Sequence, residues 1–321
     1  MRILSGIQPS GKLHLGNYFG MMSRMIEYQK NHELFCFIVN LHALTSVFDP
    51  ETLKQNTLAA TADFLSLGLD PEKSYFWVQS DVTEVTELTW YLSNITPFGL
   101  LERCTSYKDK VDKGIPASHG LFSYPVLMAA DILLFQADKV PVGKDQKQHL
   151  EMARDIAEKF NRVYGETFKI PEPDITRDSA VVPGLDGQKM SKSYDNTIEI
   201  FLPEKELKKK IMSIKTDSKT VEEPKNPDEN VIHQIYKLFV DPDQAGIMAE
   251  QFRKGNYGYG QAKQELYKVV SERFAPLREK REKLFSNPSY LKDILQMGAK
   301  KARAIAADTL EKVREKVGVV Y

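Results

Sequence analysis

Residues 3–17 read ILSGIQPSGKLHLGN, and the interpretation of the whole chain begins with them. The aliphatic first part, Ile3 to Ile7, predicts a short buried strand. Glycine, proline and serine then predict a loop, and a helical pattern begins after Asn17. A glycine-rich turn between a strand and a helix start presents backbone N–H groups at the positive end of the helix dipole. This arrangement suits a phosphate group.

The loop carries neither of the common phosphate-binding fingerprints. It has no GxGxxG and no GxxxxGK[ST] pattern, so neither a dinucleotide-binding fold nor a P-loop NTPase is predicted. It contains HLGN instead, in which His14 stands near Gly16, a residue that lets the backbone approach a ligand closely. Two interpretations fit these residues: contact with ATP from the α-phosphate side, or a plain strand-to-helix turn capped by Asn17.

A second motif, GQKMSKS, stands far downstream at residues 187–193. Lys189 and Lys192 are separated by small or flexible residues and form a mobile cationic clamp. Lysine suits a polyphosphate leaving group because its charge sits on a flexible stem and can follow charge as it develops. Taken alone, the same residues are also typical of a solvated loop.

Together and in this order, the two motifs resemble the HIGH and KMSKS signatures of the class I aminoacyl-tRNA synthetases. Residues 128–134, MAADILL, and 140–149, VPVGKDQKQH, further resemble the bacterial tryptophanyl-tRNA synthetase family. The resemblance covers nearly the whole chain and is dense from residue 3 to residue 193. It implies a tryptophan–tRNA ligase, which activates L-tryptophan with ATP to tryptophanyl-adenylate and pyrophosphate. The tryptophan is then transferred to the 3′ end of tRNA(Trp).

Composition sets the broad class of the protein. The chain has 321 residues, 42% hydrophobic and 27% charged, which predicts a globular protein with one large and one smaller domain. No apolar run approaches the ~20 residues of a transmembrane helix, and no secretory signal is recognised, so we expect a cytoplasmic protein without membrane contact. Two cysteines are too few for a disulfide framework and are expected to be buried thiols. A formal net charge of zero means that any tRNA contact must rest on local basic patches.

The first half of the chain alternates predicted strands and helices. Further strands are expected at residues 34–39, 74–79 and 139–142, and helices at residues 50–67, 82–95, 121–137 and 145–164. Such alternation predicts a parallel sheet covered on both faces, with ligands bound outside the carboxyl ends of the strands. After residue 200 only helices are expected, at residues 203–214, 230–240, 243–254, 261–285 and 288–317.

The fold class is therefore α/β, a class I synthetase Rossmann-type parallel sheet with a C-terminal all-α domain. We place the catalytic nucleotide-binding domain at residues 1–195 and the helical domain at residues 196–321. The resemblance alone assigns tRNA anticodon recognition to the helical domain.

Asp131 is the most informative single residue, because it stands in the middle of an apolar helical face. A carboxylate there is costly unless it is paired, and an ion pair with Lys139 is one explanation. The resemblance implies another, in which Asp131 accepts the indole N–H of tryptophan and His42 belongs to the same pocket. Tyr124 and Met128 are candidates to line the indole, although aromatic and Met residues at helical spacing are also typical of a plain core.

The resemblance also assigns residues to ATP. Gly143, Lys144 and Asp145 follow the fourth strand, where many family members carry Glu at the position of Lys144, so contact there is expected through the backbone. Lys110 aligns with a phosphate-binding lysine, but it also belongs to a basic run that solvent alone would explain. Val182 aligns with a residue that contacts adenine through its main chain. The remaining ATP-binding residues are Gln8, Pro9, Ser10, Gly16, Asn17, Lys189, Met190, Ser191, Lys192 and Ser193.

The implied reaction needs little covalent chemistry from the protein. The tryptophan carboxylate attacks the α-phosphorus and pyrophosphate leaves, so catalysis consists of positioning and charge stabilisation. The catalytic residues implied are His14 and Asn17 for the ATP phosphates, and Lys189 and Lys192 for the departing pyrophosphate. Mg²⁺ accompanies ATP, held mostly by phosphates and water, and no dedicated protein metal site is predicted.

The partners beyond the small molecules follow from the resemblance alone. Basic clusters at residues 205–210, 278–283 and 300–303 are interleaved with or flanked by ordinary helix residues, as in any solvated helix. Family members act as homodimers, with one tRNA spanning both subunits.

Three other functions remain as alternatives. The tyrosine enzyme of the same class would need a phenol-binding Tyr and Asp pair, and residues 128–134 argue against it. A small-molecule nucleotidyltransferase shares the HIGH-type loop but would be shorter, without the helical half and the full KMSKS clamp. A catalytically inactive tRNA-binding paralogue is disfavoured because the residues expected to be catalytic are intact.

Overall fold

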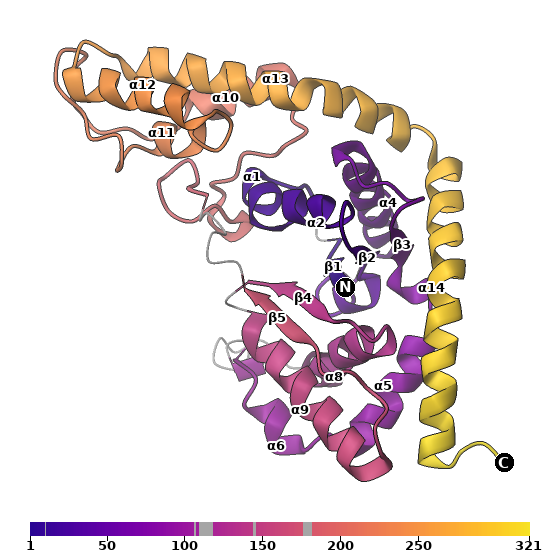
Figure 1. Ribbon diagram of the computed structural model, residues 1–321. Coiled ribbons are helices and arrows are strands. Elements are labelled where there is room, and N and C mark those ends of the chain that lie inside the picture. The colour runs from indigo at the N-terminus through magenta and orange to yellow at the C-terminus, as the bar shows by residue number, and fades with distance from the viewer. Residues whose placement is uncertain (10, 106, 109–117, 144–145, 176–181) are drawn as a thin grey trace. The chain divides into compact units, whose positions relative to one another are not determined.

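The computed structural model describes residues 1–9, 11–105, 107–108, 118–143, 146–175 and 182–321 (Figure 1). The chain forms two compact units, each built from more than one segment. Unit 1 contains Met1–Gly11, Met25–Arg177 and Asn287–Tyr321, and unit 2 contains Lys12–Arg24 and Asp178–Ser286.

A five-stranded parallel sheet forms the centre of unit 1 (Figure 1). Its order is β3-β2-β1-β4-β5. The chain adds β2 and β3 on one side of β1 and then β4 and β5 on the other side, so the order of the strands reverses between β1 and β4 although all of them stay parallel. In sheets of this kind the crevice at such a reversal binds the ligand. The strands are β1 (Arg2–Ile7), β2 (Glu33–Ile38), β3 (Tyr75–Val78), β4 (Lys139–Val142) and β5 (Glu172–Ile175).

The predicted parallel α/β fold is confirmed, and four of the strands were expected. The edge strand β5 was not expected, because its sequence EPDI is neither apolar nor alternating. Its residues pair with β4, which lies beside it on one side. Proline is tolerated in such an edge strand because the lost N–H faces away from the sheet.

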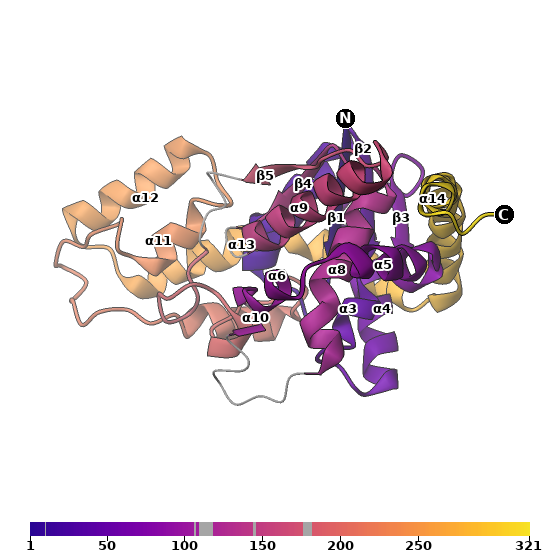
Figure 2. The same ribbon diagram turned by 90° about the horizontal axis from the view of Figure 1, so that it is seen from below.

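Side chains alternate between the two faces of this sheet. Leu4, Phe35 and Trp77 share one hydrophobic core with α5 (Glu84–Ile95), α8 (His119–Leu134) and α9 (Lys147–Tyr164). Figure 2 shows these three helices together on one side of the strands. On the opposite face Phe76 packs against Phe64 of α4 (Pro50–Leu67), with ring centroids 5.7 Å apart. The sheet is thus covered on both faces, as predicted.

The ends of α4 follow the local sequence. The side chain of Asp49 accepts a hydrogen bond from Thr52 N at 2.7 Å, and Pro50 occupies the first helical position. Gly68 ends the helix in the left-handed conformation, with φ of 111°. These are the cap, first residue and stop that the sequence predicts.

Helix α8 begins two residues earlier than predicted. Ser118 is its N-cap, and the hydroxyl of Ser118 accepts a hydrogen bond from Leu121 N at 3.1 Å. Pro125 lies inside this helix. A proline there removes one backbone hydrogen bond. Pro125 is buried in the unit 1 core region.

The last helix, α14 (Pro288–Val317), belongs to unit 1 and lies beside β3 and α5 (Figure 1). A Cβ on Gly298 would stand 1.8 Å from the carbonyl oxygen of Phe76, so only glycine permits this approach of helix and strand. Arg303 donates to Glu84 at 3.0 Å, and Arg314 forms a second ion pair with Glu87. The compact units therefore divide the chain differently from the predicted boundary between residues 195 and 196.

Unit 2 combines a short N-terminal helical segment with the helices between residues 204 and 285. The segment consists of α1 (Leu15–Asn17) and the π-helical turn η1 (Tyr18–Met22), after which α2 (Ser23–Tyr28) continues. Tyr18 and Phe19 contact the rings of Phe274 and Phe239 at 5.2 and 5.1 Å. The four helices expected here are found as α10 (Glu204–Met212), α11 (Val231–Tyr236), α12 (Pro242–Lys254) and α13 (Tyr259–Phe285).

Two further expectations concern the whole chain. Cys36 and Cys104 are both buried, as predicted, and burial raises the pKa of the Cys36 thiol. Within the described ranges, no helix is both long enough and apolar enough to cross a membrane.

Candidate active site

The two signature motifs lie side by side in unit 2, and backbone hydrogen bonds join the first motif to residues 198–200, which follow the second. Leu15 N donates to Ile198 O at 2.9 Å, and Ile200 N donates to Leu13 O at 3.1 Å. His14 and Glu199 are therefore opposite each other in a short antiparallel bridge. Because residue 198 follows the GQKMSKS loop closely, this bridge brings the HLGN turn next to that loop.

The HLGN turn is closely packed around His14. A Cβ on Gly16 would lie 2.9 Å from two atoms of the His14 ring and 3.6 Å from Cβ of Met190. Asn17 accepts a hydrogen bond from His14 N through its Oδ1 at 3.1 Å. His14 is therefore the N-cap of α1, and Asn17, which the plain interpretation expects as the cap, is the third helical residue and accepts from the N-cap backbone. Gly16 is required because any side chain there would displace the imidazole.

His14 is held as a neutral imidazole. Burial is the main cause that lowers its pKa to about 4, and the nearby charge of Lys192 acts in the same direction. The carboxylate of Glu199 opposes both but does not outweigh them. Nδ1 of His14 is buried and has no hydrogen-bond partner among the described residues. A neutral, unsatisfied ring nitrogen is suited to hydrogen-bond a ligand atom without adding a charge.

The lysine-bearing loop is a short hairpin. Met190 N donates to Val182 O at 2.9 Å, Gly184 N donates to Gln188 O at 2.7 Å, and Pro183 bridges Lys189. Val182 and Met190 are buried, with 2% and 3% of their surface exposed, whereas Lys189 and Lys192 are exposed. Ser191 and Ser193 hydroxyls lie 2.8 Å apart. The loop therefore anchors its apolar residues and presents its cations to solvent.

The residues predicted to bind the amino acid lie in unit 1, and Asp131 is the most buried of them. Asp131 in α8 is only 3% exposed, and its two carboxylate oxygens accept hydrogen bonds from Gln79 Nε2 at 2.9 and 2.8 Å. Nε2 of His42 lies 2.9 Å from Oδ2. Asp131 is therefore satisfied by Gln79 and His42, and the alternative of an ion pair with Lys139 is not needed to explain its burial.

Tyr124 and Met128 stand one turn apart on the same face of α8 as Asp131, and both are half-buried. The Tyr124 ring meets the His42 ring edge-on at 6.1 Å, and its hydroxyl is hydrogen-bonded to Nε2 of His149. Met128 packs against the hydrophobic core without being enclosed by it. This is the position expected for residues that line a pocket.

The nucleotide residues that can be placed in unit 1 follow β1 and β4. Gln8 and Pro9 come directly after β1, and Gly143 comes directly after β4. These two strand ends flank the reversal point of the sheet, where ligands bind in this architecture. Nε2 of Gln8 donates to the carbonyl of His42 at 3.4 Å. Ser10, Lys110, Lys144 and Asp145 lie outside the described residues.

Comparison with known proteins decides the family. The family model described as "tRNA synthetases class I (W and Y)" matches residues 1–275. The chain belongs to this family. The tryptophan–tRNA ligase of Fusobacterium nucleatum is 58% identical over 320 residues, covering 99% of this chain and 98% of the relative.

Two solved structures of class I synthetases are also similar. The tryptophanyl-tRNA synthetase of Campylobacter jejuni, complexed with ADP and tryptophan, is 56% identical with a TM-score of 0.95, covering 99% of this chain and all of the other. The enzyme of Mycoplasma pneumoniae is 32% identical with a TM-score of 0.83, covering 99% of this chain and 97% of the other.

In this class I synthetase, Gln79 is a residue of the candidate site that no sequence motif singles out. Gln79 follows β3, is 1% exposed, and its Oε1 accepts a hydrogen bond from Leu41 N at 3.0 Å. The same side chain thus orients Asp131 and fixes the backbone that carries His42. A signal was present, because Gln79 ends a predicted strand and ligands are expected at the carboxyl ends of the strands.

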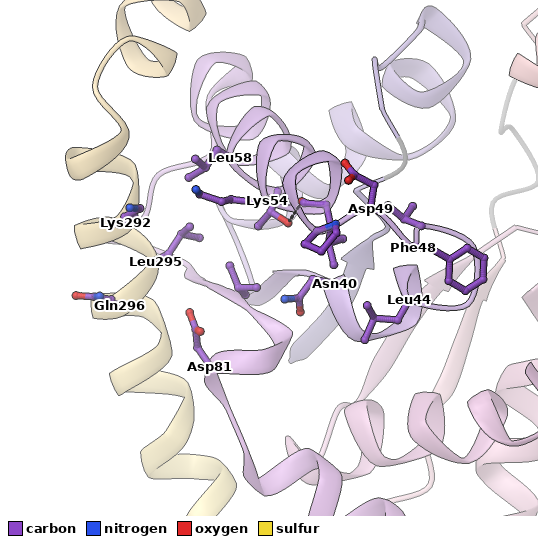
Figure 3. Close-up of a pocket in the computed structure, with 15 residues that line it drawn as sticks. Asn40, Leu44, Phe48, Asp49, Lys54, Leu58, Asp81, Lys292, Leu295 and Gln296 are labelled. Atoms are coloured by element: carbon purple, nitrogen blue, oxygen red, sulfur yellow. Dashed lines mark hydrogen bonds between the residues drawn. The ribbon is translucent and has the colours of Figure 1, made fainter. Parts of the chain in front are cut away.

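A separate cavity of about 470 Å³ lies between α4, α14 and the segment after β2 (Figure 3). Leu44, Phe48 and Leu295 give it an apolar lining, and Lys54 and Lys292 stand at its border. None of the predicted site residues that the structure describes lines this cavity. The Asp131 cluster and the cavity are therefore different features of unit 1.

Proposed function

We propose that this chain is a tryptophan–tRNA ligase. It activates L-tryptophan with ATP to tryptophanyl-adenylate and pyrophosphate, and then transfers tryptophan to the 3′ end of tRNA(Trp). The observation that carries the proposal is the buried carboxylate of Asp131, oriented by Gln79 and His42 on the face that also bears Tyr124 and Met128.

The hydrogen bonds of Asp131 leave capacity for one more donor. An ionised carboxylate offers about four lone-pair sites. Gln79 and His42 address three of them, at 2.9, 2.8 and 2.9 Å. An indole N–H would occupy the fourth, whereas the phenyl ring of phenylalanine has no donor to offer.

Such a site selects by chemistry more strongly than by shape. A pocket built to hydrogen-bond a substrate group rejects an analogue without that group by about 10⁴- to 10⁵-fold. One missing methylene in an apolar pocket is worth only about 10- to 200-fold. Because Asp131 is only 3% exposed, water does not readily fill the one acceptor site that Gln79 and His42 leave open. The preference for tryptophan then follows without a separate editing step.

Unit 2 supplies the groups for the ATP phosphates. His14 offers a neutral ring nitrogen at the HLGN turn, and Lys189 and Lys192 place positive charge where pyrophosphate departs. Their role is to stabilise charge that grows as the α-phosphorus–oxygen bond breaks, which is how most enzymes of phosphoryl transfer act. Mg²⁺ accompanies ATP and is held mainly by phosphate oxygens and water.

The larger partners are part of the same proposal. The enzyme works in the cytoplasm as a homodimer, and residues 196–321 include the surface that reads the anticodon of tRNA(Trp). The basic clusters at residues 205–210 and 278–283 lie on α10 and α13 of unit 2, whereas the cluster at residues 300–303 lies on α14 of unit 1. Large apolar side chains that stand exposed in unit 1, such as Phe48, Trp90 and Phe98, are candidates for the dimer contact.

The experiment is amino-acid-dependent ATP–pyrophosphate exchange with Mg²⁺, run in parallel with tryptophan, tyrosine and phenylalanine. The proposal predicts exchange with tryptophan alone, and charging of tRNA(Trp) in a second assay. Exchange with tyrosine would keep the class and overturn the assignment of the pocket. Absence of exchange with all three would leave the inactive tRNA-binding paralogue or the small-molecule nucleotidyltransferase as the better explanation.

A further inference from the structure

Asn196 is a buried polar residue of unit 2 that no part of the proposed mechanism uses. It lies just after the lysine-bearing loop and is only 2% exposed. The residue before it, Asp195, adopts a left-handed backbone conformation with φ of 49°. This turn points the chain back so that the side chain of Asn196 enters the loop it follows.

The amide of Asn196 pairs with the backbone on both sides of Met190. Its Oδ1 accepts a hydrogen bond from Ser191 N at 2.8 Å, and its Nδ2 donates to Lys189 O at 3.2 Å. On the other side of the same segment, Met190 N donates to Val182 O at 2.9 Å. The segment that joins Lys189 to Ser191 is therefore held from two directions, and one of them is a single side chain.

The same amide also holds the turn of the hairpin. Nδ2 of Asn196 donates to Oδ1 of Asp186 at 2.7 Å, and this carboxylate oxygen accepts a second hydrogen bond from Gln188 N at 3.1 Å. The hydrogen bond from Asn196 is the main cause that lowers the pKa of Asp186. Asn196 thus links the tip of the loop to its lysine-bearing strand.

The chain around Asn196 is shaped to admit it. A Cβ on Gly184 would lie 2.3 Å from Cγ and Nδ2 of Asn196 and 2.7 Å from its carbonyl oxygen. That carbonyl oxygen accepts a hydrogen bond from Leu185 N at 2.9 Å. Every hydrogen-bonding group of the Asn196 amide is therefore directed at the loop, and residue 184 has no side chain in its way.

We propose that Asn196 is a positioning residue for amino-acid activation, which holds the loop in the form that presents Lys189 and Lys192 to pyrophosphate. The inference rests on the proposed function, because it assumes that these lysines act on ATP. It predicts that loss of the amide slows the chemical step. Tryptophan binding should be unaffected, because the proposed tryptophan pocket is made by unit 1 residues alone.

The first test compares Asn196→Ala with wild type in tryptophan-dependent ATP–pyrophosphate exchange. We expect kcat to fall by roughly 10- to 100-fold, as for loss of hydrogen bonds that include one to a charged group. KM for tryptophan should stay within about twofold, since uniform binding is untouched. Gly184→Ala should have the same effect, because its methyl group would displace Asn196.

A matched control is Asn161→Ala in unit 1. The side chain of Asn161 holds the loop after α9 through similar hydrogen bonds to the backbone. It donates to Phe168 O at 2.8 Å and accepts from Thr167 N and Phe168 N at 3.0 and 2.9 Å. This variant should lose thermal stability while kcat stays near the wild-type value. The comparison separates a role in the reaction from a role in folding alone.

A second test reverses the polarity of the Asn196–Asp186 pair and does not depend on Asn196→Ala folding. Asn196→Asp places two carboxylates together, which raises the pKa of one of them. The kcat of this variant should therefore fall as pH rises, beyond any fall in wild type. The double variant Asp186→Asn with Asn196→Asp leaves one carboxylate in place of two, so it should remove the added pH dependence. Its kcat should stay below wild type, because the carbonyl oxygen of Lys189 still lacks the donor that Asn196 supplies.

The outcomes are distinguishable. A kcat at the wild-type level in Asn196→Ala or in Asn196→Asp would overturn the inference, and so would equal losses in kcat and tryptophan affinity. A double variant that kept the added pH dependence of Asn196→Asp would also contradict it. If wild type itself shows no tryptophan-dependent exchange, the proposed function fails instead.

Discussion

Replacement of Asp131 by asparagine should weaken the selection for tryptophan while leaving the fold in place. The side chain keeps its shape, but one of the two oxygens that accept from Gln79 becomes an NH₂ group. Asparagine also removes the negative charge that an indole N–H would meet. A hydrogen bond to a charged group is worth about 1.5–3 kcal/mol.

That energy sets the size of the effect. At 1.36 kcal/mol for each factor of ten, kcat/KM for tryptophan should fall by about 10- to 150-fold. The preference for tryptophan over phenylalanine should fall by a similar factor, since phenylalanine never used the lost acceptor. KM for ATP should not change.

The assay is ATP–pyrophosphate exchange with varied tryptophan, phenylalanine and ATP. Asp63→Asn in α4 is the control, because Asp63 is equally buried at 3% exposure and lies outside the pocket. It should affect stability at most. The reasoning is refuted if Asp131→Asn keeps the wild-type kcat/KM for tryptophan, or if KM for ATP rises by the same factor as the loss.

Three further predictions follow from other parts of the structure. Gly16→Ala should slow tryptophan activation at least about tenfold, because its Cβ would stand 2.9 Å from the His14 ring. Gly20→Ala has open space around it and should not slow activation, and exchange kinetics compare the two variants. Gly298→Ala should lower the free energy of unfolding by about 2 kcal/mol or more, because its methyl group forces α14 away from β3. Thermal denaturation measures the loss, and Gly246→Ala, which has open space around it, is the control. The His14 imidazole should titrate with a pKa of about 4 in an NMR titration, and titration near 6.5 would contradict the environment described for His14. Because the folded pKa lies below the unfolded value near 6.5, the free energy of unfolding should decline as pH falls from about 6.5 to about 4.

The sheet was largely predictable because most of its strands are apolar runs. Three strands are rich enough in apolar residues to be predicted as buried from composition alone, at residues 3–7, 34–39 and 74–79. The edge strand β5 does not, since its residues EPDI are extended through pairing with β4 and not by their own preference. A strand that forms only because it pairs with a neighbouring strand cannot be predicted from its own residues.

The division into units depends on long-range packing that the sequence pattern does not reveal. Helix α14 was predicted as a helix, but nothing local indicates that it packs against β3. Gly298 allows α14 to pack closely against β3, because it has no side chain to collide with the carbonyl oxygen of Phe76. The segment 12–24 likewise belongs to unit 2 through the pairing of residues 13–15 with residues 198–200.

The candidate site was predictable in its residue types and not in its hydrogen bonds. The motifs single out His14, Lys189 and Asp131, because a glycine-rich turn, paired lysines and a carboxylate on an apolar face are unusual in sequence. The partners of these residues come from distant segments. Gln79 beside Asp131 and Asn196 inside the lysine loop are fixed by tertiary contacts that no spacing encodes.

The central claim is that tryptophan is selected through its indole N–H, and the most direct test changes the substrate and not the protein. Exchange should be measured with tryptophan and with 3-(benzothiophen-3-yl)alanine, which keeps the bicyclic shape but has sulfur in place of the N–H group. The account predicts that kcat/KM falls by at least about 10³-fold for the analogue, because the buried Asp131 carboxylate loses a donor. A ratio within about tenfold would contradict it, since shape alone would then explain the preference.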